Sequence, residues 1–348
     1  MAPLTEMSRR TQVIAGAGVV AVIALVVGGV LVFRSGKESD DTATTVPETT
    51  TTTERVPGPI APLTGLEDPT GAVATRCAVS VKVGNTADAH PQTGVGAADV
   101  VYEEVVDGGI TRLVAVYQST APDQVGSVRS VRPTDQYILW PLRGVFAFSG
   151  GNPDELASLK GVPVVKLDET AAGGMMFRGP GRAPNNLFAD VSQMYGACAD
   201  PPPPPLFVYR PPLTASAGLP AVAADVGFAR GYETHWTWDP TQSLWLRSIF
   251  GGPDVDPDGR QIAVPNVVVM QVQYGPDPSG TSVEGRMVGS GPVAVYSDGK
   301  VVTGTWERPD KSKAAELRDA AGQPIVLTPG QTWVELMPLG NELTTTPG

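Results

Sequence analysis

One uninterrupted apolar run lies near the amino terminus of the chain. Residues 13–33 read VIAGAGVVAVIALVVGGVLVF and contain no charged side chain. At 1.5 Å per residue, a helix of this length spans about 30 Å, the thickness of the hydrocarbon core of a bilayer. Arg9 and Arg10 precede the run, so the positive-inside rule favours a cytoplasmic segment 1–12 and an exported remainder. The pattern predicts a single transmembrane anchor over 13–33. A cleaved signal peptide is the alternative, but the run is longer than a usual signal sequence.

A polar segment follows the apolar run. Residues 34–59 are rich in Thr and Pro and offer almost no apolar side chains to bury. Such a composition cannot offset the entropy lost on ordering. We therefore expect an extended, flexible stalk between the membrane and the rest of the chain.

Beyond the stalk, short β-branched runs alternate irregularly with helical patterns. Strands are expected over residues 76–83, 99–106 and 110–118. The turn Asp107-Gly108-Gly109 separates the last two, which is typical of a hairpin. Helices are expected over residues 135–143, 152–160 and 186–195. This mixture predicts an α+β or α/β amino-terminal domain over 60–200.

Five consecutive prolines, 201–205, mark a break in composition. They must adopt polyproline II, and we place a stiff linker at 201–213. Strand patterns then recur over residues 233–238, 243–249, 266–274, 292–296, 300–306 and 332–337. They predict a mainly β carboxy-terminal domain, a small sandwich or barrel, over 214–340, with a tail at 341–348. Its tryptophans, Trp236 and Trp238 among them, are interpreted as core.

Charge and composition narrow the function classes. The net charge is −11, so a general nucleic-acid scaffold is disfavoured. Two His and two Cys are too few for the usual zinc sites unless all four converge, and we expect neither a metal nor a cofactor. If the chain is exported, Cys77 and Cys198 face an oxidising compartment, and a disulfide is favoured over two free buried thiols.

Several motifs occur in a characteristic order: PLTGL (62–66), NTADAHPQTGVGAADVVYEEVVDGGITR (85–112), GSVRSVRP (126–133), FSGGN (148–152) and RAPNNLF (182–188). This order resembles the YerB-like family of bacterial extracytoplasmic proteins, which is built on a domain of unknown function. The resemblance covers residues 62–337 and implies a surface protein without a settled activity. Two features depart from it. Many members carry a lipid on a cysteine, which is absent near this apolar run, and Ser149 stands where members often have a histidine.

A local excess of arginine is the most suggestive candidate chemistry. Between residues 112 and 143 the sequence contains four Arg and two Asp, a net charge of +2 in a chain whose net charge is −11. Guanidinium groups bind carboxylate or phosphate oxygens bidentately, and amide side chains complete such a site. We therefore expect a site for an anionic cell-wall or lipid-linked ligand, such as phosphate, pyrophosphate or uronate. The candidate residues are Arg112, Arg129, Arg132, Arg182, Asn185 and Asn186.

Three functions stay open at this point. The first is a membrane-anchored extracytoplasmic protein that binds or scaffolds an anionic envelope component. The second is a hydrolase or transferase on envelope polymers, which would use Glu103 or Asp135 with the arginines as electrostatic stabilisers. The third is a structural interaction module, in which Arg129 and Arg132 pair with acids at positions 99, 103, 104 or 107 and brace the hairpin. No protein partner is indicated.

Overall fold

The structure, a computed structural model, describes residues 57–211 and 214–348. The predicted anchor 13–33, and the stalk up to residue 56, lie outside the described residues. Within the described ranges, no helix is long and apolar enough to cross a membrane.

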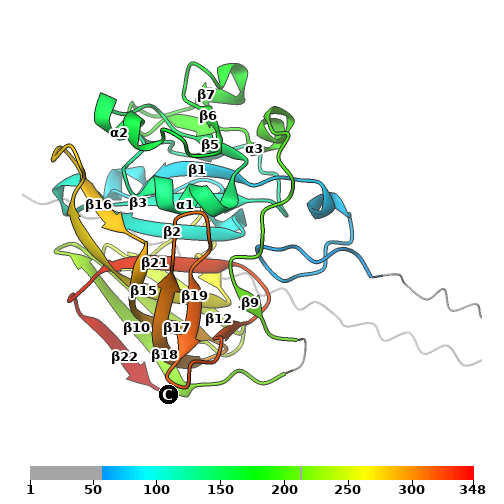
Figure 1. The fold of residues 1–348 in the computed structure, drawn as a ribbon, viewed down its shortest axis with the longest axis vertical. Coiled ribbons are helices and arrows are strands. Elements are labelled where there is room, and N and C mark those ends of the chain that lie inside the picture. The colour runs from blue at the N-terminus through cyan, green and yellow to red at the C-terminus, as the bar shows by residue number, and fades with distance from the viewer. Residues whose placement is uncertain (1–56, 212–213) are drawn as a thin grey trace, which may run out of the picture. The chain divides into compact units, whose positions relative to one another are not determined.

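A mixed sheet organises the amino-terminal half (Figure 1). Its order is β6 (Val165–Leu167), β5 (Val145–Ala147), β1 (Val79–Gly84), β3 (Thr111–Tyr117) and β2 (Val100–Val105). The predicted hairpin is confirmed, because β2 and β3 pair antiparallel across the Asp-Gly-Gly turn. Strands β1, β2 and β3 are buried on both faces, which explains their nearly continuous apolar sequences.

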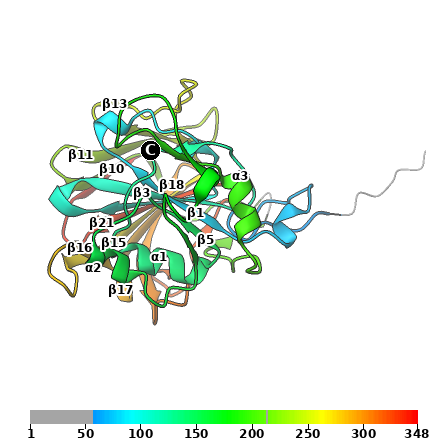
Figure 2. The same ribbon diagram turned by 90° about the horizontal axis from the view of Figure 1, so that it is seen from above.

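Short helices flank this sheet. They are α1 (Asp135–Leu142), α2 (Pro153–Ser158) and α3 (Val191–Met194). Figure 2 shows α1 and α2 on one side of β1 and β3. The start of α2 is fixed by a capping box, in which the Asn152 side chain accepts from the Glu155 N–H and the Glu155 side chain accepts from the Asn152 N–H. Single 3-10 turns lie at Ala72–Ala74, Ala87–Ala89, Val95–Ala97, Asp107–Gly109, Gly173–Met175 and Tyr195–Ala197.

The prediction of a helix over 186–195 is wrong in its first half. Residues Leu187–Ala189 form strand β8, which lies between β4 (Val125–Gly126) and β7 (Met176–Arg178) in a small separate sheet. The Asp190 side chain then accepts from the Gln193 N–H and starts α3. Pairing with β4 and β7 outweighs the local helical preference of this segment.

The main sheet continues into the carboxy-terminal half. Strand β2 pairs in parallel with β21 (Thr332–Pro338), and the order runs on through β15 (Asn266–Pro276), β17 (Gly289–Ser297), β18 (Lys300–Arg308) and β19 (Glu316–Asp319). One sheet therefore joins the two halves (Figure 1). The chain is mostly β with few helices, which confirms the predicted β-rich second domain.

A further group of strands completes the carboxy-terminal half and is joined to the main sheet, because its strand Leu219–Ala229 also pairs with β18. It contains β22 (Leu343–Pro347), β10 (Leu219–Ala229), β11 (Tyr232–Asp239), β12 (Leu244–Ile249), β13 (Gly252–Pro253) and β14 (Ala263–Val264). The expectation of a tail at 341–348 is wrong, because β22 pairs with β10. Three further strands are β16 (Val283–Arg286), which forms a hairpin with β15, and the pair β9 (Val208–Tyr209) and β20 (Val326–Leu327).

Tryptophans fill the core of the carboxy-terminal half. Trp236, Trp245 and Trp333 are wholly buried, and Trp236 meets Trp333 edge to face at 5.6 Å between ring centroids. Their interpretation as core residues is confirmed, although Trp238 is only partly buried. The Cys77–Cys198 disulfide, also predicted, ties the segment before β1 to the segment after α3.

Candidate functional site

The segment 127–133 positions the arginines by running alongside the end of β1. Gly84 N donates to the Ser127 carbonyl and Arg129 N to the Lys82 carbonyl, both at 2.9 Å. Arg112 lies opposite Gly84 in the β1–β3 register, so the two share a face of the sheet. A Cβ on Gly84 would lie 3.0 Å from Arg129 Cγ. The missing side chain of Gly84 therefore lets the Arg129 stem pack onto β1 on the face that carries Arg112.

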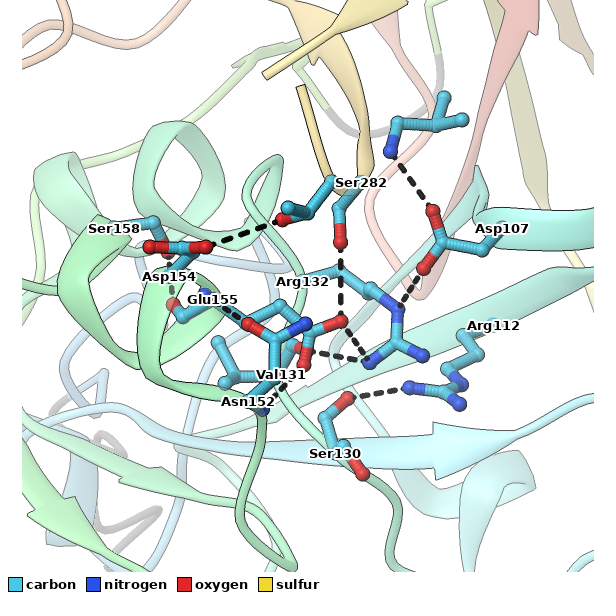
Figure 3. Close-up of polar contacts among 12 residues, drawn as sticks. Asp107, Arg112, Ser130, Val131, Arg132, Asn152, Asp154, Glu155, Ser158 and Ser282 are labelled. Carbon is cyan, nitrogen blue, oxygen red and sulfur yellow. Dashed lines mark hydrogen bonds and ion pairs between the residues drawn. The ribbon is translucent and has the colours of Figure 1, made fainter. Parts of the chain in front are cut away.

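Arg112 is nearly buried, and one backbone carbonyl accepts from its side chain. The side chain is on a residue only 6% exposed, and its Nη1 donates to the Ser130 carbonyl at 2.7 Å (Figure 3). Among the described residues, no carboxylate lies within ion-pair distance of its guanidinium. Burial, together with the neighbouring positive charges of Arg132 and Arg129, lowers the pKa of Arg112 to about 10, while Glu104 and Asp135 act in the opposite direction.

Arg129 is half-buried and contacts one of the predicted amides. Its Nη1 donates to Asn185 Oδ1 at 2.8 Å, and Asn185 Nδ2 donates to Asp88 Oδ2 at 2.8 Å. Burial lowers the pKa of Arg129, while Asp88 acts in the opposite direction. Asn185 thus links Arg129 to a carboxylate without a direct ion pair.

Arg132 is engaged by two carboxylates (Figure 3). Its Nε lies 3.1 Å from Asp107 Oδ2, and its Nη1 lies 3.1 Å from Glu155 Oε1. Asp107 also accepts from the Val283 N–H, and Glu155 accepts from the Ser282 hydroxyl. Arg132 therefore ties the β2–β3 turn and α2 to the β15–β16 hairpin, and its pairing with Asp107 matches the bracing alternative.

The remaining predicted residues lie apart from Arg112. Asn186 Oδ1 accepts from Arg178 Nη1 at 3.1 Å, and Arg178 forms a bidentate pair with Glu169. Arg182 is exposed. In the described part of the chain, no contact joins Arg182 or Asn186 to Arg112.

Both predicted catalytic carboxylates are wholly buried. Asp135 Oδ1 lies 2.7 Å from Lys82 Nζ, and its Oδ2 accepts from the Arg132 N–H at 2.7 Å. Lys82 also pairs with Glu104. Burial raises the pKa of Glu104 to about 7, against the opposing charge of Lys82.

Glu103 faces the other side of β2 and belongs to a second buried network. Its Oε2 accepts from Arg247 Nη2 at 2.6 Å, and its Oε1 accepts from Asn85 Nδ2 at 2.9 Å. Arg247 also pairs with Asp254, which lies 3.0 Å from His90 Nδ1. This network joins residues of both halves across the β2–β21 junction.

Sequence reasoning missed most of these buried charges. Lys82 and Arg247 are not among the predicted site residues, yet the sequence does contain a signal that they are buried charges. Lys82 interrupts the apolar strand VSVKVG, and Arg247 shares the inward face of β12 with Trp245 and Ile249. A charge at an inward position of an otherwise apolar strand requires a buried partner.

Other features do not coincide with the arginines. A cavity of about 570 Å³ lies between residues 205–208 and the stretch 309–325. No group of His, Cys, Asp or Glu suited to a metal ion occurs within the described residues.

The comparisons with known proteins agree with this fold. Residues 63–201 match the family described as "Protein of unknown function (DUF3048) N-terminal domain", and residues 224–334 match its C-terminal domain. The chain is 23% identical over 288 residues to "Putative lipoprotein YerB" of Bacillus subtilis (strain 168), covering 80% of this chain and 86% of that protein. It resembles the crystal structure of YerB protein from Bacillus subtilis with a TM-score of 0.72 and 22% identity, covering 82% of this chain and 99% of the other. The resemblance drawn from the motifs is confirmed, and the chain belongs to the DUF3048 family of proteins of unknown function.

Proposed function

We propose that this chain is a membrane-attached, extracytoplasmic protein of the bacterial envelope that binds an anionic envelope component through Arg112 and Arg129. The observation that carries the proposal is the state of Arg112. Its guanidinium is nearly buried and bonded to one carbonyl, and it feels the positive charges of Arg129 and Arg132 as well as the more favourable charges of Glu104 and Asp135.

A bound anion would supply hydrogen-bond acceptors and negative charge to the Arg112 guanidinium. A guanidinium has five N–H donors, and a charge-assisted hydrogen bond to an anion is stronger than one to a neutral carbonyl. Within the described residues, Nε and Nη2 of Arg112 form no hydrogen bond. A phosphate or carboxylate group would accept from these donors and offset the repulsion from Arg129. Asn185 Oδ1 accepts from Arg129 Nη1 and so holds the second guanidinium of the proposed site in place.

Three observations support the location. The Cys77–Cys198 disulfide is typical of exported proteins. The apolar run 13–33 has the length of a membrane span. The relative YerB carries the name of a lipoprotein.

The buried carboxylates favour binding over catalysis. Glu103 and Asp135 are inaccessible to a polymer, and each is neutralised by a cation, Arg247 and Lys82 respectively. A general acid or nucleophile must reach the substrate. Arg132, which bonds two carboxylates, is assigned a bracing role.

Thermal unfolding followed by tryptophan fluorescence tests the proposal. The full-length chain in detergent would be heated with sulfate, pyrophosphate or glucuronate, since a ligand of the native state raises its melting temperature. We expect stabilisation by at least one of these anions, and its loss in Arg112→Met. Arg178→Met is the matched control, because Arg178 is an exposed arginine already paired with Glu169. Equal stabilisation of wild type and Arg112→Met would refute the proposed site.

Protease treatment of intact cells tests the location separately. The described part of the chain should be digested, leaving a short membrane-bound fragment. Full protection in intact cells, with digestion only after lysis, would contradict the proposed location.

A further inference from the structure

A compact group of buried charges lies beside Arg112. Lys82 Nζ contacts both Glu104 and Asp135, and all three side chains are fully buried. Glu104 stands directly opposite Arg112 in the β2–β3 register, so both project from the same face of the sheet. The charges of Glu104 and Asp135 act on Arg112.

The charges of this group balance only without a ligand. With every group ionised, Lys82 and Arg112 contribute two positive charges, while Glu104 and Asp135 contribute two negative charges. An anion held by Arg112 would leave the buried group with excess negative charge. Net charge in a poorly solvated interior is costly, and a titratable group there takes up a proton instead.

Glu104 is better placed than Asp135 to take up that proton. Asp135 keeps two donors, the Lys82 ammonium and the Arg132 N–H. Glu104 Oε2 is buried without a hydrogen bond, although the Thr134 hydroxyl is close enough to influence the carboxyl. From β15, Tyr274 is near enough for the charge of Glu104 to act on its hydroxyl, and it adds no positive charge. Burial already raises the pKa of Glu104 to about 7, so its proton is exchangeable near neutral pH.

We propose that anion binding at Arg112 is coupled to protonation of Glu104, so that the chain holds its anionic ligand more tightly in mildly acidic than in alkaline surroundings. This inference rests on the proposed function. In the step, Glu104 takes a proton from solvent as the anion enters, and it returns the proton to solvent as the anion leaves.

Isothermal titration with sulfate tests the coupling, because sulfate stays a dianion across the pH range used. The full-length chain would be titrated at pH 6.0 and 8.5 at constant ionic strength. We expect binding on the order of tenfold tighter at pH 6.0, the change that follows if the anion shifts the Glu104 pKa by one unit. At pH 7.5, the binding heat should vary with the ionisation enthalpy of the buffer and report net proton uptake.

Two variants identify the group that titrates. Glu104→Gln should bind sulfate with an affinity that does not change between the two pH values. Glu284→Gln is the matched control: Glu284 also faces α1, through Gln136 at 2.9 Å, and burial raises its pKa, but it has no contact with Lys82. This variant should keep the wild-type pH dependence. Proton uptake by the wild type needs no variant, so its absence would overturn the coupling even if Glu104→Gln does not fold.

The outcomes separate the two proposals. Sulfate binding that needs Arg112 but involves no proton uptake would overturn the coupling and leave the proposed function standing. Coupling that persists in Glu104→Gln would also overturn it, by assigning the proton elsewhere. If neither sulfate nor the other anions bind, both proposals fail together.

Discussion

Replacing Arg247 with methionine tests the buried network between the two halves. Arg247 is fully buried, pairs with Glu103 and Asp254, and lies over the Trp333 ring at 4.5 Å. Glu335 adds a third carboxylate, whose pKa burial and Glu103 raise well above its usual value. Methionine keeps much of the volume of the side chain and removes the only guanidinium that these carboxylates contact within the described residues.

The expected loss of stability follows from the carboxylates that Arg247→Met leaves buried without their guanidinium partner. Removing one partner of a buried ion pair typically costs about 3 to 5 kcal/mol. For a chain of this size, 1 kcal/mol corresponds to about 2 °C in melting temperature, so Arg247→Met should melt roughly 6 to 10 °C lower. Differential scanning calorimetry measures this directly. The control Arg260→Met removes an exposed arginine paired with Asp258, and it should melt close to the wild type.

The pH dependence makes this prediction specific. Although burial works against it, Arg247 holds the pKa of Asp254 below its usual value in the wild type. The stability that this lowered pKa contributes is present above the pKa of Asp254 in the unfolded chain, and it is lost as the pH falls. Without Arg247, burial raises the pKa of Asp254, and the variant loses stability as the pH rises. The deficit of Arg247→Met should therefore be larger at pH 8 than at pH 5. A loss below about 1 kcal/mol, or one of equal size at both pH values, would refute this description of the network.

Three further changes have defined outcomes. The free energy of unfolding should fall by up to about 3 kcal/mol between pH 4.5 and 8 through Glu104. Burial raises the pKa of Glu104 from 4.5 to about 7 in the folded chain, and its contribution to stability is lost as the pH rises through this folded pKa. Glu104→Gln should flatten this slope in urea titrations. Replacing Cys77 and Cys198 with alanine should cost about 5 kcal/mol by the chain-entropy estimate for a separation of 121 residues, and added reductant should then have no effect on the variant's unfolding. Gly304→Ala places a Cβ 1.9 Å from a carbonyl oxygen of β19 and should cost at least about 1 to 3 kcal/mol, whereas Gly252→Ala meets nothing within 4 Å and should unfold within about 1 kcal/mol of wild type.

Local signals in the sequence predicted the elements whose structure is set locally. The β2–β3 hairpin follows from its Asp-Gly-Gly turn, and α2 follows from Asn152, Pro153 and the acidic residues of its first turn. The disulfide follows from cysteine count and compartment. Arg129 and Arg132 were grouped as one candidate site, whereas the structure gives them different partners, Asn185 and Asp107.

Long-range pairings could not be predicted in the same way. The parallel pairing of β2 with β21 joins residues more than 200 positions apart, and no local pattern encodes that register. This pairing creates the buried surroundings of Glu103, which the sequence presented as a candidate catalytic carboxylate. Strand β22 was missed because its Thr-rich sequence contributes little to the core and depends on the edge of β10.

The position of a bound anion tests the central claim most directly. Crystals of the chain grown with selenate, a tetrahedral dianion with an anomalous signal, would locate it without assumptions about affinity. The account predicts an anomalous peak within hydrogen-bonding distance of the guanidinium groups of Arg112 and Arg129, with Arg132 still bonded to Asp107 and Glu155. Selenate bound only elsewhere, with Arg112 unchanged on the Ser130 carbonyl, would contradict it.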